Sequence, residues 1–497
     1  MREFSLETCP EVFVSDASIA GWVSRAQAQG KLRKLASRLY TRNLTDPPEA
    51  IVSRHIWPLV ASYFPGALIA DRTALENKPA ADGSICLIAK GTRDIILPGL
   101  VLRPRKGLGP QPQDKPFING LYLSSTARAI LENMQPSRAS KSRVPRTLGR
   151  KAIEQHLDML ISRGGEKDIN RLRDQINHLA PTLDLVEEGA LLDAMIGALL
   201  GTREAILETS TGLARQAGQP YDLKRLELFQ QLHTALRSQA PITRLIPPRT
   251  QTQKSVFAFY EAYFSNFIEG TEFEIAEAAN IIFKGEMPQS RPADAHDILG
   301  TFRMAVDPAP LATESIQTFA KYLKSCHATI MAGRPDMGPG QFKSQRNRAG
   351  GTIFVAPDQV EGTLTQGLAL LRSLETPFQR AVFMMFLITE VHPFTDGNGR
   401  TARLLMNAEL SAAGEERIII PTVYRNNYLA ACKALSHSGV SEPLIRVLDY
   451  AWRWSASINW QDVESTRQTL ESCNAFVDPQ FAEQNGIRLK MPDLGVD

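Results

Sequence analysis

The sequence lacks several features that would set it apart from ordinary globular proteins. Within its 497 residues, no apolar segment reaches the ~18 residues that a membrane-spanning helix needs. The first residues, MREFSLETCPEVF, lack the basic-then-apolar layout of a signal peptide. The five cysteines are scattered and form neither a CxxC pair nor a metal-ligand cluster. We therefore expect a cytoplasmic protein with reduced thiols and no membrane partner, built from two or three domains.

Acidic residues are scarce in the first third of the chain. Residues 1–151 hold 23 Lys and Arg against 12 Asp and Glu, a net charge of +11. The remainder holds 33 against 41, a net of −8, so the overall charge of +3 hides an asymmetry. A basic first third joined to an acidic remainder indicates that the two parts meet different partners.

The residues richest in chemistry lie at 391–403, with the sequence VHPFTDGNGRTAR. The apolar run at 381–388 predicts a buried helix before them, and the leucine-rich run from Leu404 predicts a second helix after them. The polar turn between the two helices holds one base, one acid, two glycines, an amide and two arginines. That inventory suits the handling of a phosphate chain.

Each residue of the turn has a chemical use. Pro393 cannot continue the first helix, so His392 should end it, where a neutral imidazole can take a proton from a hydroxyl. Asp396 is a hard oxygen ligand of the kind that holds Mg²⁺ on a nucleotide. The remaining residues suit an anion at the start of the second helix. Gly397 and Gly399 allow the backbone to approach the anion closely, and Asn398 supplies an amide donor. Arg400 and Arg403 lie on one helix face.

The segment HPFTDGNGRTAR resembles the signature of the Fic family, HPF-x-(D/E)-G-N-G-R-x-x-R, at every signature position. The resemblance covers about residues 255–460 and implies a mainly α Fic fold that transfers AMP from ATP to a hydroxyl of a target protein. It implies that His392 is the general base and Asp396 the Mg²⁺ ligand. It places Gly397, Asn398 and Gly399 in an anion hole, and Arg400 and Arg403 on the distal phosphates.

An aromatic-rich helix is predicted upstream, at about 256–270, and it ends in SNFIEG. This hexapeptide matches S/T-x-x-x-E-G/N, the mark of the inhibitory helix of Fic proteins, at Ser265, Glu269 and Gly270. By that resemblance Glu269 pairs with Arg403 and takes the place of the ATP γ-phosphate, so the resting protein is autoinhibited.

A β-hairpin is predicted at Gly350-Gly351, because two glycines precede the extended residues Thr352, Ile353 and Phe354. In the Fic family the corresponding flap pairs its edge with an extended segment of the target. Arg425 and Tyr428 resemble the family segment that covers the nucleotide base.

The basic first third predicts a short helix from Asp16 to Gly30 and then a hairpin at 31–42. Together with strand–helix passages at 65–76 and 123–131, this order resembles the AbiEi-type antitoxin and transcriptional regulator family, whose N-terminal module is a winged helix. The resemblance implies that five cations face DNA phosphates: Lys31, Arg33, Lys34, Arg38 and Arg42. A solvated basic face on a small docking domain remains the alternative.

The predicted layout is mainly α, with an α+β winged-helix-like domain at 1–136 and a basic linker or phosphate-binding strap at 137–151. A helical connector at 152–246, whose first helix breaks at Gly164-Gly165, leads to the Fic domain at 247–477, and a tail follows at 478–497.

The leading hypothesis is a protein adenylyltransferase that uses ATP and Mg²⁺ and modifies a Tyr, Thr or Ser of a target protein or of itself. One alternative is a DNA-binding regulator whose Fic domain senses nucleotide. Another is a Fic enzyme that uses a different donor, or that removes AMP with Glu269 positioning a water. A homodimer is one of the oligomeric states left open.

Overall fold

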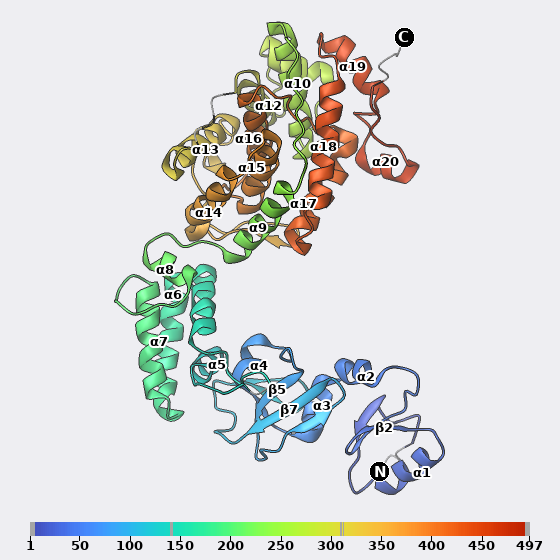
Figure 1. The fold of residues 1–497 in the computed structure, drawn as a ribbon, viewed down its shortest axis with the longest axis vertical. Coiled ribbons are helices and arrows are strands. Elements are labelled where there is room, and N and C mark those ends of the chain that lie inside the picture. Colours follow the sequence, from blue (N-terminus) through green and yellow to red (C-terminus); the bar gives the residue numbers. More distant parts are fainter. Residues whose placement is uncertain (1–4, 140–142, 309–310, 312, 493–497) are drawn as a thin grey trace. The chain divides into compact units, whose positions relative to one another are not determined.

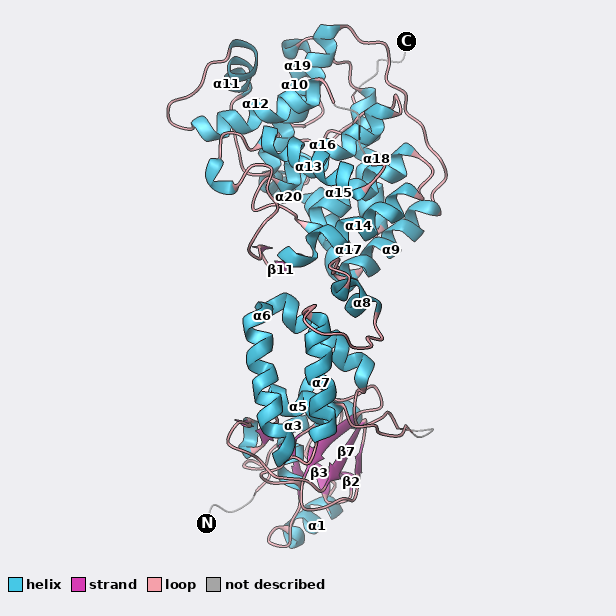
Figure 2. Ribbon diagram, turned by 90° about the vertical axis from the view of Figure 1, so that its left-hand side faces the viewer, coloured by secondary structure: helices cyan, strands magenta, loops and turns pink. Residues whose placement is uncertain are grey.

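The computed structural model describes residues 5–139, 143–308, 311 and 313–492. The chain divides into two compact units, Met1–Gly218 and Gln219–Asp497, which are described separately below (Figure 1). The fold is mainly helical, as predicted, and the larger sheets lie in the first unit (Figure 2). Among the described residues, no helix is long and apolar enough to cross a membrane.

The first unit begins with a three-stranded antiparallel sheet, in the order β1-β3-β2, and one helix, α1. The elements are β1 (Val12–Val14), α1 (Ala20–Ala28), β2 (Arg33–Ala36) and β3 (Leu39–Thr41). The predicted helix and hairpin are both present. The helix starts later than predicted, because the Asp16 carboxylate accepts the Ser18 N–H at 2.9 Å and closes a turn before it.

A mixed six-stranded sheet follows, in the order β6-β7-β5-β4-β9-β8. Strands β5 and β7 are parallel, as are β4 and β9, and the other pairs are antiparallel. Its strands and helices are α2 (Pro48–Arg54), α3 (Ile56–Tyr63), β4 (Leu68–Ile69), α4 (Asp71–Glu76), β5 (Ser84–Ile88), β6 (Ile95–Leu97), β7 (Leu100–Arg105), β8 (Lys115–Pro116), β9 (Tyr122–Leu123) and α5 (Thr126–Asn133).

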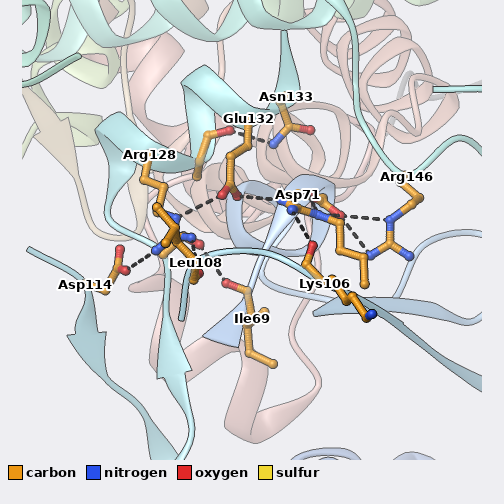
Figure 3. Close-up of polar contacts among 12 residues, drawn as sticks. Ile69, Asp71, Lys106, Leu108, Asp114, Arg128, Glu132, Asn133 and Arg146 are labelled. Carbon is orange, nitrogen blue, oxygen red and sulfur yellow. Dashed lines mark hydrogen bonds and ion pairs between the residues drawn. The ribbon is translucent and has the colours of Figure 1, made fainter. Parts of the chain in front are cut away.

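A chain of alternating charges is buried beside this sheet (Figure 3). Asp71 accepts from Arg105 at 2.8 Å and from Arg146 at 2.9 Å. Glu132 lies 3.3 Å from Arg105 and 2.9 Å from Arg128. Because Asp71 is only 2% exposed, its charge needs these two arginine partners to offset the loss of hydration.

These contacts correct the prediction of a flexible linker or phosphate-binding strap at 137–151. Arg146 is committed to Asp71, and the Val144 N–H donates to the Asp82 carboxylate at 3.0 Å. The described part of the segment is therefore fastened to the sheet, while residues 140–142 lie outside the described residues. The sequence displayed the segment's cations but not the buried carboxylates that neutralise them.

Three helices complete the first unit: α6 (Arg150–Thr182), α7 (Val186–Leu199) and α8 (Ser210–Gln216). The predicted break in the first of them is present, because Gly165 has a φ of 70° inside α6. The predicted connector at 152–246 is nevertheless divided between the units. Helix α9 (Leu223–Arg237) belongs to the second unit, where its buried residues Phe229 and Leu232 join the main core.

The second unit is a helical domain built around α15 (Pro377–Val391) and α16 (Asn398–Ala412), which lie side by side (Figure 1). Helix α15 is apolar from Ala381 to Ile388, and every residue of that stretch is buried. The surrounding elements are α10 (Gln251–Ile268), α11 (Ile275–Ala279), α12 (Pro292–Val306), α13 (Ile316–Ile330), β10 (Arg348–Ala349), β11 (Thr352–Ile353), α14 (Val360–Arg372), α17 (Arg425–Ser438), α18 (Glu442–Ser457), α19 (Val463–Ser472) and α20 (Pro479–Asn485).

The segment at 478–497, set apart as a tail in the sequence, packs against the second unit in its described part. Helix α20 is capped by the Asp478 carboxylate, and Ala482 and Leu489 are buried in the core cluster that contains the aromatic face of α10. Residues 493–497 lie outside the described residues. The segment carries too few apolar residues for a periodic signal, which is why the sequence did not reveal its packing.

Candidate active site

The turn at 391–400 joins the two central helices and has two residues in left-handed backbone conformations. Helix α15 ends at Val391, and His392 follows with a φ of 52°, since the proline after it disfavours the right-handed helical conformation there. Helix α16 begins at Asn398, preceded by Gly397 with a φ of 72°. A Cβ on Gly397 would lie 2.6 Å from the Met331 sulfur, so the chain approaches its neighbour too closely for a side chain.

His392 is held as a neutral imidazole with one nitrogen available. Its Nδ1–H donates to the Thr389 carbonyl at 3.1 Å, which leaves the Nε2 lone pair to accept a proton. The ring stacks on Phe354, with centroids 3.7 Å apart and planes at 4°. Burial lowers the pKa of His392 to about 4. At neutral pH the ring is therefore uncharged and is chemically suited to be a general base.

Asn398 braces the turn with its side-chain amide. Its Oδ1 accepts the Phe394 N–H at 2.9 Å, and its Nδ2 donates to the Phe394 carbonyl at 2.9 Å. Both ends of the amide therefore hold the turn, and one of the two Nδ2 hydrogens is used in doing so. The N–H groups of the first turn of α16 have no intrahelical acceptors and are suited to an anion.

His327, on α13, contacts the turn through its ring and was missed by the sequence analysis. Its ring stacks on Phe394, with centroids 3.7 Å apart. Its Nε2–H donates to the Asp396 carbonyl at 2.9 Å, and its Nδ1 accepts the Gly340 N–H at 2.9 Å. Burial lowers the pKa of His327 to about 4. A lone histidine on an amphipathic helix carried no signal that pointed to this contact.

Lys343 and Asn347 brace the same turn and were also missed. Lys343 Nζ donates to the Val391 carbonyl at 3.3 Å, and its N–H donates to the Pro393 carbonyl at 2.9 Å. Asn347 Nδ2 donates to the Phe394 carbonyl at 2.8 Å. Burial lowers the pKa of Lys343 to about 7. The segment that leads into the hairpin thus grips the residues on both sides of His392.

Arg400 points inward, contrary to the prediction of a distal-phosphate contact. Its Nη1 lies 2.5 Å from the Asp297 carboxylate and 3.4 Å from the Asn266 amide oxygen. The Arg400 side chain is 3% exposed and that of Asp297 is 0% exposed. A carboxylate buried to that degree needs a cation beside it, and Arg400 supplies the charge.

Arg403 makes the predicted ion pair with Glu269. Arg403 Nη2 lies 2.7 Å from Glu269 Oε1, and the guanidinium also donates to the Ser265 carbonyl at 2.8 Å and to its Oγ at 3.0 Å. Glu269 ends helix α10, and Gly270 follows with a φ of 89°. A Cβ on Gly399 would lie 2.2 Å from Glu269 Oε1. The carboxylate therefore sits directly against the turn that is suited to an anion.

Asp396 is the acidic group of the turn, and its side chain is 48% exposed. Its Oδ1 accepts the Gly397 N–H at 2.7 Å, and its Oδ2 lies 3.9 Å from Arg400 Nη2. Among the described residues, no group of three His, Cys, Asp or Glu side chains could hold a metal ion. One exposed carboxylate nevertheless fits Mg²⁺, which usually takes its remaining ligands from substrate phosphates and water.

The predicted hairpin is present: β10 pairs with β11 around Gly350-Gly351, with Ala349 opposite Thr352 and Arg348 opposite Ile353. Phe354 follows β11 and covers the His392 ring, whereas the Ile353 side chain is 60% exposed. The hairpin therefore lies beside the candidate base.

Tyr428 does not have the place predicted for a residue that covers a nucleotide base. It is 2% exposed, and its hydroxyl lies 3.2 Å from the Met385 sulfur inside the core. Arg425 donates to the Ile268 carbonyl at 3.0 Å, at the end of α10. The aromatic ring faces inward because α17 needs an apolar face against α15.

In the first unit, the five candidate DNA-binding cations divide into two groups. Arg33 donates to the Asp46 carbonyl at 2.5 Å, and Arg38 donates to the Ser15 carbonyl at 2.8 Å. Lys31, Lys34 and Arg42 are exposed. Arg38 is exposed as well, but its guanidinium is tied to Ser15, so Lys31, Lys34 and Arg42 are the exposed cations for which no such backbone contact is described.

Comparisons with known proteins find a family and relatives to which this chain is similar. The family described as Fic/DOC matches residues 317–410. A curated protein adenylyltransferase Fic of Drosophila erecta is 30% identical over 196 residues, 38% of this chain and 39% of its own length. That of Aedes aegypti is 26% identical over 233 residues, 46% of each chain. This chain thus spans less than half the length of these relatives.

Among solved structures, a Fic domain containing signaling protein from Bacteroides thetaiotaomicron is similar at 20% identity and a TM-score of 0.35, covering 48% of this chain and 97% of that one. The matched residues contain most of α13, the hairpin, α15, the turn at 391–400 and most of α16. Residues 317–410 of this chain therefore match the Fic/DOC family.

Proposed function

We propose that this chain is a protein adenylyltransferase that transfers AMP from ATP to a Tyr, Thr or Ser hydroxyl of a target protein or of itself. The observation that carries the proposal is the neutral His392, whose Nε2 is available next to the N-terminus of α16. The curated relatives that match the same domain are named protein adenylyltransferase, which favours this reaction over other phosphate chemistry.

In the proposed reaction the acceptor hydroxyl attacks the α-phosphorus of ATP. An oxygen–phosphorus bond forms, the bond between the α- and β-phosphates breaks, and pyrophosphate leaves in line. His392 Nε2 takes the hydroxyl proton. The N–H groups at the start of α16 stabilise the charge that develops on the phosphate oxygens. Asp396 would hold Mg²⁺, which neutralises charge on the phosphates.

The proposal includes a restraint by Glu269. Its carboxylate lies against Gly399 and on Arg403, the two features that a terminal phosphate would use. Two anions do not share one guanidinium and one helix N-terminus at close range without strong repulsion. Glu269 therefore competes with the γ-phosphate, and the resting protein has little activity.

The test is incubation of Glu269→Gly protein with a lysate, Mg²⁺ and ATP labelled at the α-phosphate. Protein-bound label is expected, with little from the wild type. His392→Ala in the same background should abolish it, and Glu272→Gly, at an exposed acid three residues further on, should behave like the wild type. Absence of label on every protein, this chain included, would contradict the proposal if the variant is folded.

DNA binding by the first unit is a second proposal, supported by the exposed cations Lys31, Lys34 and Arg42 on one small sheet and its flank. Their simultaneous replacement by Gln is expected to reduce binding to duplex DNA in a mobility-shift assay. It should also make the slope of log K against log salt shallower by about 0.9 for each phosphate that the variant no longer neutralises. Unchanged affinity and slope would contradict the proposal.

A further inference from the structure

The hairpin of the second unit has an outer edge on β11, the side of that strand that faces away from β10. Gly350-Gly351 form a two-residue turn, so Ala349 and Thr352 exchange hydrogen bonds across it and the pair after them does not. The Phe354 N–H donating to the Asn347 carbonyl at 3.2 Å confirms this alternation. The N–H and carbonyl of Ile353 therefore point away from β10, toward the open side of β11.

Arg225, on α9, takes the outward carbonyl. Its Nη2 donates to the Ile353 oxygen at 2.6 Å, and its Nη1 lies 2.8 Å from Glu390 Oε1. Glu390 is 3% exposed and also accepts the Ser436 hydroxyl at 3.0 Å. The guanidinium is thus fixed at one end by a buried carboxylate and presents its other end to the hairpin.

A second contact holds the same strand from α17. The Thr352 hydroxyl and His437 Nε2 lie 2.6 Å apart. Strand β11 is therefore tethered to α9 through a backbone atom and to α17 through a side chain. Of the two tethers, only the one from Arg225 uses an atom that an added strand would need.

We infer that Arg225 controls access to the edge of the hairpin at which an acceptor segment pairs. An extended segment that adds to β11 must donate an N–H to the Ile353 carbonyl, which is the atom that Arg225 holds. Ile353 immediately precedes Phe354, whose ring covers His392, so this edge leads directly to the candidate base. The acceptor must displace the guanidinium before its hydroxyl reaches Nε2.

This restraint is separate from the one at Glu269 and rests on the proposed transfer reaction. Glu269 lies against the phosphate-binding turn and would oppose ATP. Arg225 contacts the hairpin and Glu390, not the residues of that turn to which the nucleotide is assigned. Its removal should therefore change the use of the protein acceptor and leave the use of ATP as it was.

The test variant is Arg225→Lys, because a lysine keeps a positive charge for the buried Glu390 but has no planar fork to serve two acceptors. Arg237→Lys, on the same helix and 56% exposed, is the matched control. If Arg225→Lys does not fold, Arg225→Gln combined with Glu390→Gln replaces the ion pair by a neutral pair.

The first measurement does not depend on the reaction. Trypsin binds its substrates as extended strands, so cleavage after Arg346 and Arg348 reports how open the hairpin is. Loss of one charge-assisted hydrogen bond is expected to raise the cleavage rate about three- to tenfold, with Arg237→Lys unchanged. An unchanged cleavage rate would overturn the inference.

The second measurement is made in the Glu269→Gly background, with a dialysed bacterial lysate as acceptor and ATP labelled at the α-phosphate. Arg225→Lys should raise the initial labelling rate at limiting lysate by about three- to tenfold and leave the KM for ATP unchanged. Faster cleavage with equal or slower labelling would overturn the inference, because Arg225 would then be supporting the productive hairpin. No label from Glu269→Gly alone would instead mark the failure of the proposed function, and cleavage would then decide whether Arg225 restrains the edge.

Discussion

Replacement of Glu269 by Ala should destabilise the second unit when nucleotide is absent. Arg403 is 6% exposed and would lose its 2.7 Å carboxylate partner, while it keeps the Ser265 carbonyl and hydroxyl. Breaking a fully buried ion pair costs about 3–5 kcal/mol. Because Glu269 is 31% exposed and two acceptors remain, we expect about 1–2 kcal/mol. Ala is preferred to Gly here because Gly adds backbone freedom to the unfolded chain.

The destabilisation should reverse when ATP binds. For a domain of this size, 1 kcal/mol corresponds to about 2–4 °C in Tm, so the variant should melt roughly 2–8 °C below the wild type. A ligand at 100 times its Kd stabilises by about 2.7 kcal/mol. The variant should gain more from ATP than the wild type does, because only in the variant can a phosphate reach Arg403 without displacing a carboxylate.

The assay is calorimetric melting with and without ATP and Mg²⁺, followed for the transition of the second unit. Glu272→Ala is the matched control, since it removes an exposed acid just beyond the end of α10. Equal Tm values for the variant and the wild type, with equal gains from ATP, would refute the reasoning. Glu269 would then neither stabilise Arg403 nor compete for the site.

Three further predictions follow from buried polar contacts. The pKa values of His327 and His392 are lowered from 6.5 to about 4, so between these pH values the unfolded state binds more protons than the folded state. Tm should therefore fall as the pH drops from about 6.5 to 4. A Tm that does not change over this pH range would contradict the prediction. Asn398→Asp places an oxygen against the Phe394 carbonyl and should cost the second unit about 2–3 kcal/mol in a denaturant titration; a decrease below 0.5 kcal/mol, roughly the weakest hydrogen bond, would be inconsistent. Asn can adopt the left-handed backbone of Asp71, so Asp71→Asn removes only the charge between the two arginines. The variant should destabilise the first unit by about 2–4 kcal/mol. Stability equal to that of the wild type would be the contrary result.

Sequence reasoning succeeded where a short pattern in the sequence determined the structure. A proline after His392 forces the end of a helix, and two glycines before extended residues form a hairpin. The pairing of Glu269 with Arg403 spans 134 residues and came from the resemblance to a family signature, not from a local rule. Each of these predictions depended on a short pattern that the sequence displays in full.

The sequence failed where a side chain's partner is a distant backbone group or a buried charge. Asn398 stands in an anion-binding signature, and its amide satisfies the otherwise unpaired N–H of Phe394. His327 lies 69 residues from Asp396 and gave no sign that it would hold the carbonyl there. Tyr428 was placed on a nucleotide because its segment matched, yet the amphipathic face of α17 turns it into the core. Satisfying buried polar groups is a property of the folded chain, and short patterns do not contain it.

The family signature gives Arg400 and Arg403 the same role, a contact with the distal phosphates, but the two arginines differ in how deeply their carboxylate partners are buried. Arg400 is paired with Asp297, a carboxylate with no exposure, so no solute can replace that partner without opening the core. Arg403 is paired with Glu269, a carboxylate 31% exposed at the end of a helix, so a dissolved phosphate can take its place. The first pair fixes α16 against α12, and the second can exchange. Control of the proposed reaction therefore belongs to Arg403, because only its partner can leave while the fold remains intact.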